Sequence, residues 1–385
     1  THITSSMHQK HLIKQLSQHL PKQLTARTIS FLHPHRTVKR LSSSSCPLSY
    51  RSSPAEFALA PTTELPNPTS PIYVVGGLYG NTQALKAIIN LASKETSPPN
   101  IIFNGDFNFF NIHPSTFSTI NSTVLSSPFH LSTAGNIERE ISTESSNYIG
   151  CGCSYPSFVS QSTITRSDKI VKSLHSTCAT STYNSQLGKL PNFMKIEYHG
   201  VKIAVLHGDF HSLSGWSFSA ESMSPPSPTL RASLSVAPDY PTTQESDVVE
   251  MCEEAGVEIV ACTHTCLPYG QKFTNPKTSK EYLIFNSGSA GMSNFSNATS
   301  GLITRITPES SPSYLPNSFG GRAVYSSNVG GVRVEGFEVV FDDGKWRDEF
   351  LMQWPEGTAA YDSYWGRITG GVEYWDVGQA AREGV

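Results

Sequence analysis

Four short apolar runs in this 385-residue chain each lead to a side chain that can bind a metal ion. They are the runs Ile101–Asn104 before Asp106, Leu131–Gly135 before Asn136, Val201–Leu206 before His207, and Glu258–Thr263 before His264. Open α/β sheets bind ligands at the carboxyl ends of their strands. One carboxylate, one amide and two imidazoles form a hard-to-borderline ligand set. The sequence therefore predicts a metal site built from four strand ends.

The first apolar run, Ile72–Val75, continues into a glycine-rich turn, Gly76–Asn81, and then into an amphipathic segment, Thr82–Ala92. The spacing of its apolar residues predicts a helix, with Thr82 as its N-cap. Strand, turn, helix and strand form a βαβ unit, which predicts a parallel sheet and an α/β fold. The turn does not fit the spacing of a P-loop or a dinucleotide-binding loop.

Length and composition exclude several classes of protein. A chain of 385 residues can bury a full core in one large domain or two. The net charge of -3 predicts no attraction to nucleic acid or to a membrane surface. No apolar run approaches the roughly 20 residues that span a bilayer. The seven cysteines have no regular spacing, which argues against a disulfide framework and favours a reducing compartment.

Residues 1–71 differ in composition from the rest. No acidic residue precedes Glu56, whereas eight Lys or Arg residues lie in that stretch, and the segment from Met7 to Leu24 can form a basic amphipathic helix. Such a composition is typical of an organelle transit peptide, followed here by a Pro- and Thr-rich linker. We predict import into the mitochondrion, with plastid or cytoplasm as alternatives. A disordered tail of biased composition is the competing interpretation.

The remaining chain divides into a main domain at 72–310, with an insertion near 145–190, and a C-terminal arm at 311–385. The arm is rich in aromatic residues and is expected to pack on the main domain. Within the insertion, Cys151 and Cys153 form either a redox pair or a tight buried turn. We favour the turn.

Six sequence blocks occur together in one order, and they resemble the calcineurin-like metallophosphoesterases over about Ile72–Arg305. The likeness is greatest to their small bacterial-type branch of phosphodiesterases and diadenosine tetraphosphatase-like enzymes. The resemblance implies a sandwich of two mixed β-sheets flanked by helices, and metal-dependent phosphoester hydrolysis. The blocks are Gly77-Leu-Tyr-Gly-Asn-Thr-Gln-Ala-Leu85, Asn104-Gly-Asp106, Ala134-Gly-Asn136-Ile-Glu138, Val205-Leu-His207-Gly208, Thr263-His264-Thr-Cys266-Leu-Pro268 and Asn286-Ser-Gly288-Ser-Ala-Gly291.

The chain departs from the family pattern at four positions. Gly77 and Tyr79 stand where the family has the Asp and His of one metal site, and Cys266 stands where it has the last His. Ile137 replaces the His that assists the leaving group. The resemblance implies that this chain lacks the residues that bind only the first of the family's two metal ions. Cys266 is a weak candidate to replace one of them.

The resemblance also implies that the shell of the other metal is complete, with Asp106, Asn136, His207 and His264 as its ligands. We therefore predict one divalent ion, Mn, Fe or Zn. Taken singly, each residue also fits a cap, a turn or a satisfied core histidine. The family order of all four together favours ligation.

Two functions follow. The first is hydrolysis of a small phosphodiester or phosphomonoester at one metal ion. The second is a metal-bound pseudoenzyme that binds a phosphate ligand or a partner protein. Glu138 and Asp209 are weak candidates to replace the lost acid, although a hydrogen-bonded or solvated carboxylate is the commoner role for both. Tyr79 either donates to a phosphate or fills the vacated space, and we favour filling. The sequence fixes neither the substrate nor the oligomeric state.

Overall fold

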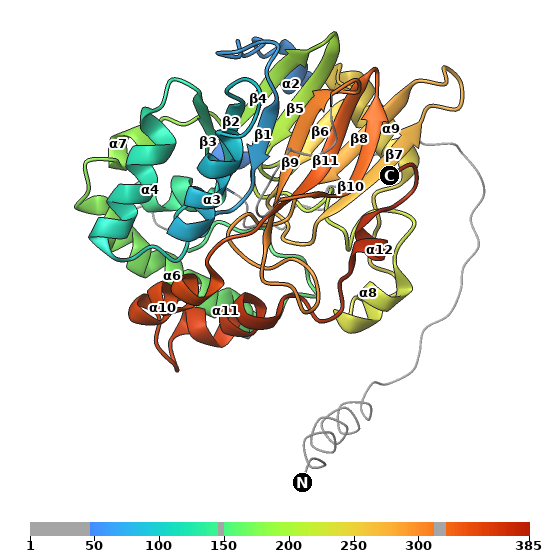
Figure 1. Ribbon diagram of the computed structural model, residues 1–385. Helices are drawn as coiled ribbons and strands as arrows, with labels where there is room; N and C mark the ends of the chain where they lie inside the picture. The colour runs from blue at the N-terminus through green and yellow to red at the C-terminus, as the bar shows by residue number, and fades with distance from the viewer. Residues whose placement is uncertain (1–46, 145–149, 312–320) are drawn as a thin grey trace, which may run out of the picture. The chain divides into compact units, whose positions relative to one another are not determined.

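The computed structural model describes residues 47–144, 150–311 and 321–385. The predicted leader helix between Met7 and Leu24 lies outside this part of the chain. Two mixed β-sheets share an apolar core, and helices flank them (Figure 1). This confirms the predicted fold class, an α/β sandwich of two mixed sheets flanked by helices.

The first sheet has the strand order β10-β11-β9-β1-β2-β3. Strands β1, β2 and β3 are parallel, while β9 pairs antiparallel with both β1 and β11, and β10 pairs antiparallel with β11. The bounds of these strands are β1 Ile72–Val75, β2 Asn100–Asn104, β3 His130–Thr133, β9 Gly301–Pro308, β10 Ala323–Val329 and β11 Val332–Val339.

The second sheet has the strand order β4-β5-β6-β8-β7. Its three central strands β5, β6 and β8 are parallel, and the two edge strands pair antiparallel with their neighbours. The bounds are β4 Phe193–Tyr198, β5 Val201–Leu206, β6 Ile259–Cys262, β7 Tyr269–Thr274 and β8 Glu281–Asn286.

Helices cover both sides of this pair of sheets, with α3 and α4 beside β1–β3 and α9 beside the second sheet (Figure 1). The predicted helix Thr82–Ala92 is α3. Its N-cap is Asn81 and not Thr82, because the Asn81 side chain accepts from the backbone N–H groups of Gln83 and Ala84. The helical elements are η1 Leu48–Tyr50, α2 Pro54–Leu59, α3 Thr82–Ala92, α4 Pro114–Ser126, α5 Asn136–Ser142, α6 Gln161–Ala179, α7 Asn184–Leu187, α8 Pro228–Ser233, α9 Glu245–Ala255, α10 Asp343–Gln353, α11 Ala359–Gly370 and α12 Val377–Ala380. None of the helices in the described ranges is long and apolar enough to cross a membrane.

Strand β1 shows how the layers are built. Successive side chains of a strand point to opposite faces of its sheet. Ile72 and Val74 join the core between the two sheets, whereas Tyr73 and Val75 join the core beneath the helices. All four are buried, so the strand is apolar throughout rather than alternating.

Two segments differ from the domain limits expected from sequence. Within residues 47–71, assigned above to a leader and linker, Tyr50, Phe57 and Leu65 are buried against the domain. Residues 323–339, assigned to a C-terminal arm, form β10 and β11 inside the first sheet. The arm proper therefore consists of α10, α11 and the residues that follow.

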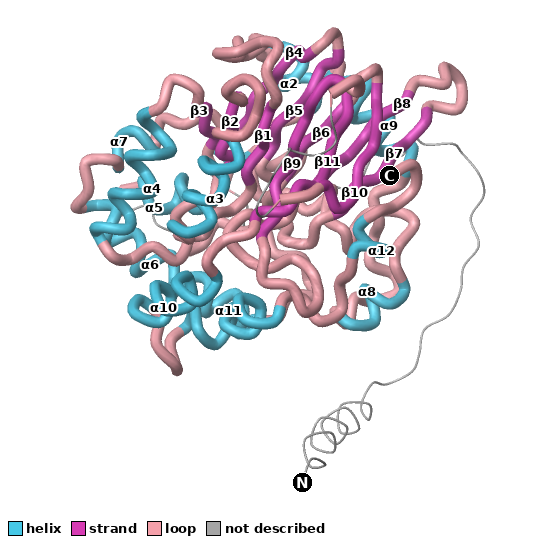
Figure 2. Tube along the Cα trace, viewed as in Figure 1, coloured by secondary structure: helices cyan, strands magenta, loops and turns pink. Residues whose placement is uncertain are grey.

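Asn104 joins the two sheets at the carboxyl ends of their parallel strands. Its amide nitrogen donates to the carbonyl oxygen of Leu206 at 2.6 Å, and its amide oxygen accepts from Thr133 at 2.7 Å. Its carbonyl oxygen accepts from Thr263 Oγ1 at 3.0 Å. The loops that follow these strands gather between the sheets and helices α10, α11 and α12 (Figure 2). The sheets thus bring distant strand ends to one place.

Candidate metal centre and its cavity

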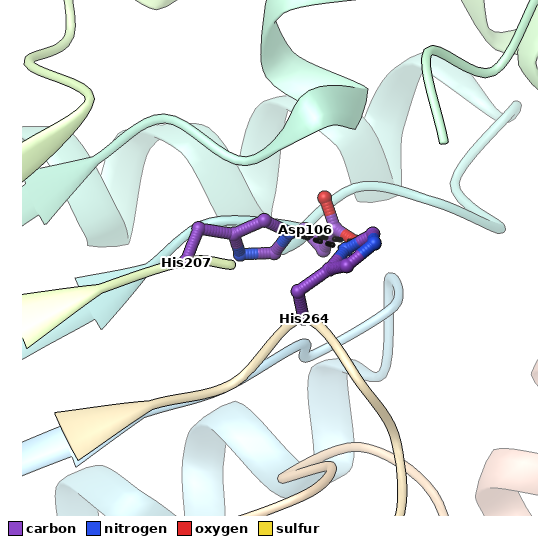
Figure 3. A group of neighbouring side chains, drawn as sticks. All are labelled: Asp106, His207 and His264. Carbon is purple, nitrogen blue, oxygen red and sulfur yellow. Dashed lines mark hydrogen bonds and ion pairs between the residues drawn. The ribbon is translucent and has the colours of Figure 1, made fainter. Parts of the chain in front are cut away.

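The structure brings the four predicted ligand residues together. Asp106 follows β2, Asn136 begins α5, His207 follows β5 and His264 follows β6. All four side chains are buried, with exposed fractions between 0% and 7%. Figure 3 shows Asp106, His207 and His264 pointing towards one another from three separate segments.

The ligand atoms lie at separations that suit one small cation. His207 Nε2 is 3.1 Å from Asn136 Oδ1, 3.2 Å from His264 Nδ1 and 3.4 Å from Asp106 Oδ2. Ligand atoms that each lie about 2.0–2.1 Å from a tetrahedral zinc ion are roughly 3.3 Å apart. Asp106, His207 and His264 also form a metal-ligand group whose donor atoms all lie within 4.8 Å of one another.

Hydrogen bonds on the far side of His207 and Asn136 turn a lone pair of each side chain inwards. His207 Nδ1 lies 2.9 Å from the carbonyl oxygen of Asn104, which can only accept, so Nδ1 carries the hydrogen. In a neutral ring Nε2 then offers a lone pair. The amide nitrogen of Asn136 donates to the carbonyl of Cys151 at 2.8 Å and to Cys153 Sγ at 3.2 Å, which turns its oxygen towards His207.

Three atoms that accept hydrogen bonds, Asp106 Oδ2, Asn136 Oδ1 and His207 Nε2, therefore lie together, and His264 Nδ1 lies beside them. Such atoms repel one another unless a proton or a cation lies between them. In addition, His264 Nε2 is buried and has no hydrogen-bond partner within the described ranges. The residues present fit a divalent cation.

Two glycines let the ligand loops approach one another. Gly105 and Asp106 both have left-handed backbones, with φ of 76° and 55°. A Cβ atom at position 105 would lie 2.4 Å from the Gly135 nitrogen and 2.7 Å from His207 Nδ1. A Cβ atom at position 135 would lie 2.2 Å from Asp106 Oδ1. Only hydrogen atoms fit at these two positions.

The charges within the group favour an ionised Asp106, make His207 easier to protonate and keep His264 neutral. Burial alone raises the pKa of Asp106, but the charges of His207 and His264 and the hydrogen bond from His207 hold this pKa below its ordinary value. Burial lowers the pKa of His207, but Asp106 outweighs burial and raises it above 6.5. Burial and the nearby His207 lower the pKa of His264 to about 3.

Glu138 organises the loop that carries Asp106. Its carboxylate accepts from the backbone N–H groups of Asp106 at 2.6 Å, Phe107 at 3.1 Å and Gly135 at 3.1 Å. Burial and the Asp106 charge raise the pKa of Glu138 to about 7. The side chain does not line the cavity described below. Glu138 is a positioning residue, and the geometry does not place it as the missing acid.

Asp209 has a comparable structural role in another loop. Its Oδ1 accepts from the backbone N–H groups of His211 at 2.8 Å and Ser212 at 2.9 Å, and its Oδ2 accepts from Ser217 at 2.9 Å. Asp209 does not line the cavity either. It shapes the loop that presents Trp216.

The side chain of Tyr79 occupies the space beside Gly77. A Cβ atom at Gly77 would lie 2.3 Å from Tyr79 Cζ, so the phenol ring occupies the space that a ligand at position 77 needs. Tyr79 is 4% exposed and has a left-handed backbone with φ of 52°. Its hydroxyl lies 3.1 Å from Cys266 Sγ. Tyr79 fills this volume, as predicted.

A cavity of about 410 Å³ opens beside Asp106, Asn136 and His264. Aromatic side chains form much of its wall, and Ile137 also lines it. The aromatic residues are Tyr79, Phe109, Tyr155, Trp216, Tyr364 and Tyr374. Most of these residues belong to no sequence motif, because they come from the insertion, the Asp209 loop and the C-terminal arm.

Cys151 and Cys153 form a bend beside this site. Both thiols are free. The backbone N–H of Cys151 donates to Asp168 at 2.9 Å, and the bend supplies both acceptors of the Asn136 amide. The turn favoured from sequence thus holds one ligand residue in place.

Comparisons with known proteins give structural likenesses only. No protein-family model matches the chain, and no curated protein matches it. Among solved structures it is similar to a metallophosphoesterase from Sphaerobacter thermophilus, with 15% identity, 78% of this chain and 100% of that chain covered, and a TM-score of 0.43. It is also similar to a hypothetical protein from Pyrococcus horikoshii, with 13% identity, 79% and 100% covered, and a TM-score of 0.45. A protein serine/threonine phosphatase from Saccharomyces cerevisiae has 15% identity, 74% and 86% covered, and a TM-score of 0.37.

Proposed function

We propose that this chain is a calcineurin-like metallophosphoesterase that hydrolyses a small phosphodiester or phosphomonoester at a single divalent ion. One observation carries the proposal: side-chain oxygen and nitrogen atoms of Asp106, Asn136, His207 and His264 lie together at separations that suit one cation. The six ordered sequence blocks supply the reaction class. The resemblance covers about Ile72–Arg305, and the site lies within that range.

The fit of the Tyr79 ring against Gly77 supports one ion in place of two. A ligand at position 77 requires space that the ring already fills. Cys266, the weak candidate ligand, faces the Tyr79 hydroxyl at 3.1 Å. It does not belong to the group formed by Asp106, His207 and His264.

Residues of the protein would position both the cation and the ester. A divalent cation held by these four residues supplies Lewis acidity towards a phosphoryl oxygen and a water molecule. Glu138 holds the Asp106 loop, and Asn104 fixes the His207 tautomer. The aromatic cavity wall excludes bulk water and fits the organic part of a small ester. A site made of two imidazoles, a carboxylate and an amide oxygen can bind Mn, Fe or Zn.

A second function, a metal-bound pseudoenzyme that binds a phosphate ligand or a partner protein, is favoured by one specific observation. Ile137 lines the cavity where the resemblance places the histidine that assists the leaving group. Loss of a general acid costs about 10²–10⁴ in rate. Glu138 and Asp209 do not compensate, because backbone amides occupy their oxygens.

Metal analysis and hydrolysis assays together test the proposal. The purified protein is loaded with Mn, Fe or Zn, and bound metal is counted by mass spectrometry. Each form is then assayed against aryl phosphodiesters and phosphomonoesters. Asp106→Asn is the test variant, because asparagine tolerates the left-handed backbone at this position. Asp348→Asn, an exposed position on α10, is the matched control.

We expect one equivalent of metal per chain and hydrolysis that the Asp106→Asn variant loses and the Asp348→Asn variant keeps. Two equivalents would overturn the single-ion site. Equal hydrolysis rates in the wild type and the Asp106→Asn variant with every metal would reject the hypothesis of an enzyme. The pseudoenzyme would then be the remaining hypothesis.

A further inference from the structure

Helix α11 places one cationic side chain in the wall of the cavity. Arg367 is the sole arginine or lysine among the described residues that line it. The same cavity is lined by Asp106, Asn136 and His264 from the candidate metal centre. Arg367 lies outside the region that resembles the family, so the resemblance gives it no role.

Hydrogen bonds to loop carbonyl oxygens fix one edge of the guanidinium. Arg367 Nε donates to the carbonyl of Ser293 at 2.9 Å. Its Nη2 donates to the carbonyl of Cys266 at 2.9 Å and lies 3.3 Å from Asn294 Oδ1. Among the hydrogen bonds of the described residues, Nη1 makes none. Docking of α11 accounts for Nε and Nη2 but leaves Nη1 available to a ligand.

The anchor point of Arg367 is the edge of the lost metal site. Cys266 occupies the last ligand position of that site, and Tyr79, whose hydroxyl contacts Cys266, occupies another. Arg367 Nη2 thus binds the backbone of the residue whose thiol contacts the Tyr79 hydroxyl. The guanidinium therefore supplies a positive charge close to where the second ion of the family would lie.

Two carboxylates also face this cavity and weaken its positive potential. Glu373 is exposed to solvent, where water screens its charge. Glu221 is 7% exposed, and burial raises its pKa, although Arg382 and Arg367 oppose that shift. Neither residue forms an ion pair with Arg367 among the ion pairs of the described residues.

We propose that Arg367 binds the phosphoryl group of the ligand next to the metal centre and contributes the positive charge of the missing second ion. Guanidinium groups bind phosphate oxygens through hydrogen bonds that are roughly twice as strong as neutral ones. The inference rests on the proposed phosphoesterase or phosphate-binding function. It makes the C-terminal arm part of the binding site.

Phosphate titration of the metal-loaded protein tests this role without depending on turnover. Protein carrying one equivalent of Mn is titrated with inorganic phosphate by calorimetry, and metal affinity and Tm are measured in parallel. The variants are Arg367→Gln and Arg367→Lys. The matched control is Arg347→Gln, because Arg347 on α10 also docks on α11, through the carbonyl of Thr369, but does not line the cavity.

We expect Arg367→Gln to weaken phosphate binding by roughly 10- to 100-fold, which corresponds to the loss of one hydrogen bond to a charged group. Arg367→Lys is expected to be intermediate, and Arg347→Gln to stay within about twofold of the wild type. Metal affinity should be the same in all variants. An unchanged phosphate affinity in Arg367→Gln overturns the proposal, as does a wild-type protein that binds metal but not phosphate.

A second measurement needs no variant. Phenylglyoxal modifies accessible arginines, and mass spectrometry locates each adduct. Inorganic phosphate should slow modification of Arg367 and leave Arg347 unaffected. Equal rates at Arg367 with and without phosphate overturn the proposal. If the proposed function is wrong, the protein binds no metal, which is a different result. In that case the phenylglyoxal experiment still shows whether phosphate protects Arg367.

Discussion

The carboxylate of Glu138 accepts the backbone N–H of Asp106 at 2.6 Å, so a buried side chain from α5 holds the loop that follows β2. The same carboxylate also binds Phe107 and Gly135. Asp106 keeps its left-handed backbone within this set of bonds. The metal centre thus depends on a residue that does not point into it.

Replacing Glu138 by Gln should damage both the fold and the metal centre. The amide nitrogen of Gln cannot accept from backbone N–H groups, and each buried group left unpaired costs about 1–3 kcal/mol. We expect a lower Tm and metal binding weakened by roughly 10- to 100-fold. Calorimetry measures both. Glu144→Gln, an exposed position near the end of α5, is the control. Wild-type metal affinity in Glu138→Gln would contradict this role.

Metal affinity should rise with pH. A cation and a proton compete for His207 Nε2, and Asp106 raises the pKa of this ring above 6.5. Below that pKa the proton must leave before the metal binds, so affinity falls by up to about tenfold per pH unit. His264, whose pKa is about 3, is already neutral, and Asp106 is already ionised. Near pH 6 we expect release of about one proton per metal, measured by calorimetry in buffers of different ionisation enthalpy. A metal affinity that does not change between pH 5.5 and 8 would contradict the competition between the metal and the proton for His207.

Gly77 and Tyr79 should be energetically coupled. Gly77→Ala places a Cβ atom against the phenol ring and should destabilise the protein by about 1–3 kcal/mol. In a Tyr79→Ala background most of this cost should disappear, because the ring is gone. Urea denaturation of the two single variants and the double variant measures the coupling. Gly366→Ala, which meets no neighbour within 4 Å, is the control. Additive effects would disprove the contact.

Phe57 should stabilise the domain although it lies within residues 1–71, the segment expected to hold only a leader and a linker. Its ring is 1% exposed and lies 5.0 Å from Phe193 and 5.3 Å from Phe210, measured between ring centroids. Phe57→Ala should lower the free energy of unfolding by about 3–5 kcal/mol. Leu59→Ala, at an 88% exposed position of the same helix, should have little effect. Equal stability of the two variants would show that α2 does not contribute to the fold.

A fusion protein tests the proposal that the N-terminal segment is a mitochondrial leader. Residues 1–46, fused to a fluorescent protein, should direct it to mitochondria. The same fusion with the Lys and Arg residues of this segment replaced by Gln should remain in the cytoplasm, because an uncharged helix loses its attraction to the membrane potential. A plastid or cytoplasmic signal from the unaltered fusion would reject mitochondrial import. Truncated protein for other studies should start at residue 47, since Phe57 is part of the core.

Sequence alone located the four converging residues because each follows or closes an apolar run whose pattern is strong. Asp106 comes two residues after β2 and His207 directly after β5, and these two strands end beside each other although they belong to different sheets. Those patterns depend on local residues only. They could therefore be interpreted without knowledge of the tertiary contacts.

The same reasoning missed β10 and the far wall of the cavity. On β10, Ser327 points inwards between Tyr325 and Val329, which weakens the apolar alternation of the strand. Trp216 and Arg367 carry no motif, because their roles arise only from tertiary contacts across long sequence distances. The linker limits failed for a related reason. The aromatic contacts of Phe57 are with residues more than 130 positions later.

The position of Arg367 near the end of the chain separates two events during synthesis. Asp106, Asn136, His207 and His264 all leave the ribosome before α11 does. Arg367 comes 103 residues after His264 (367 minus 264), a length that takes roughly 5–20 s to translate at 5–20 residues per second. Synthesis therefore delivers the four candidate ligand residues before the arginine that we propose to bind the phosphoryl group.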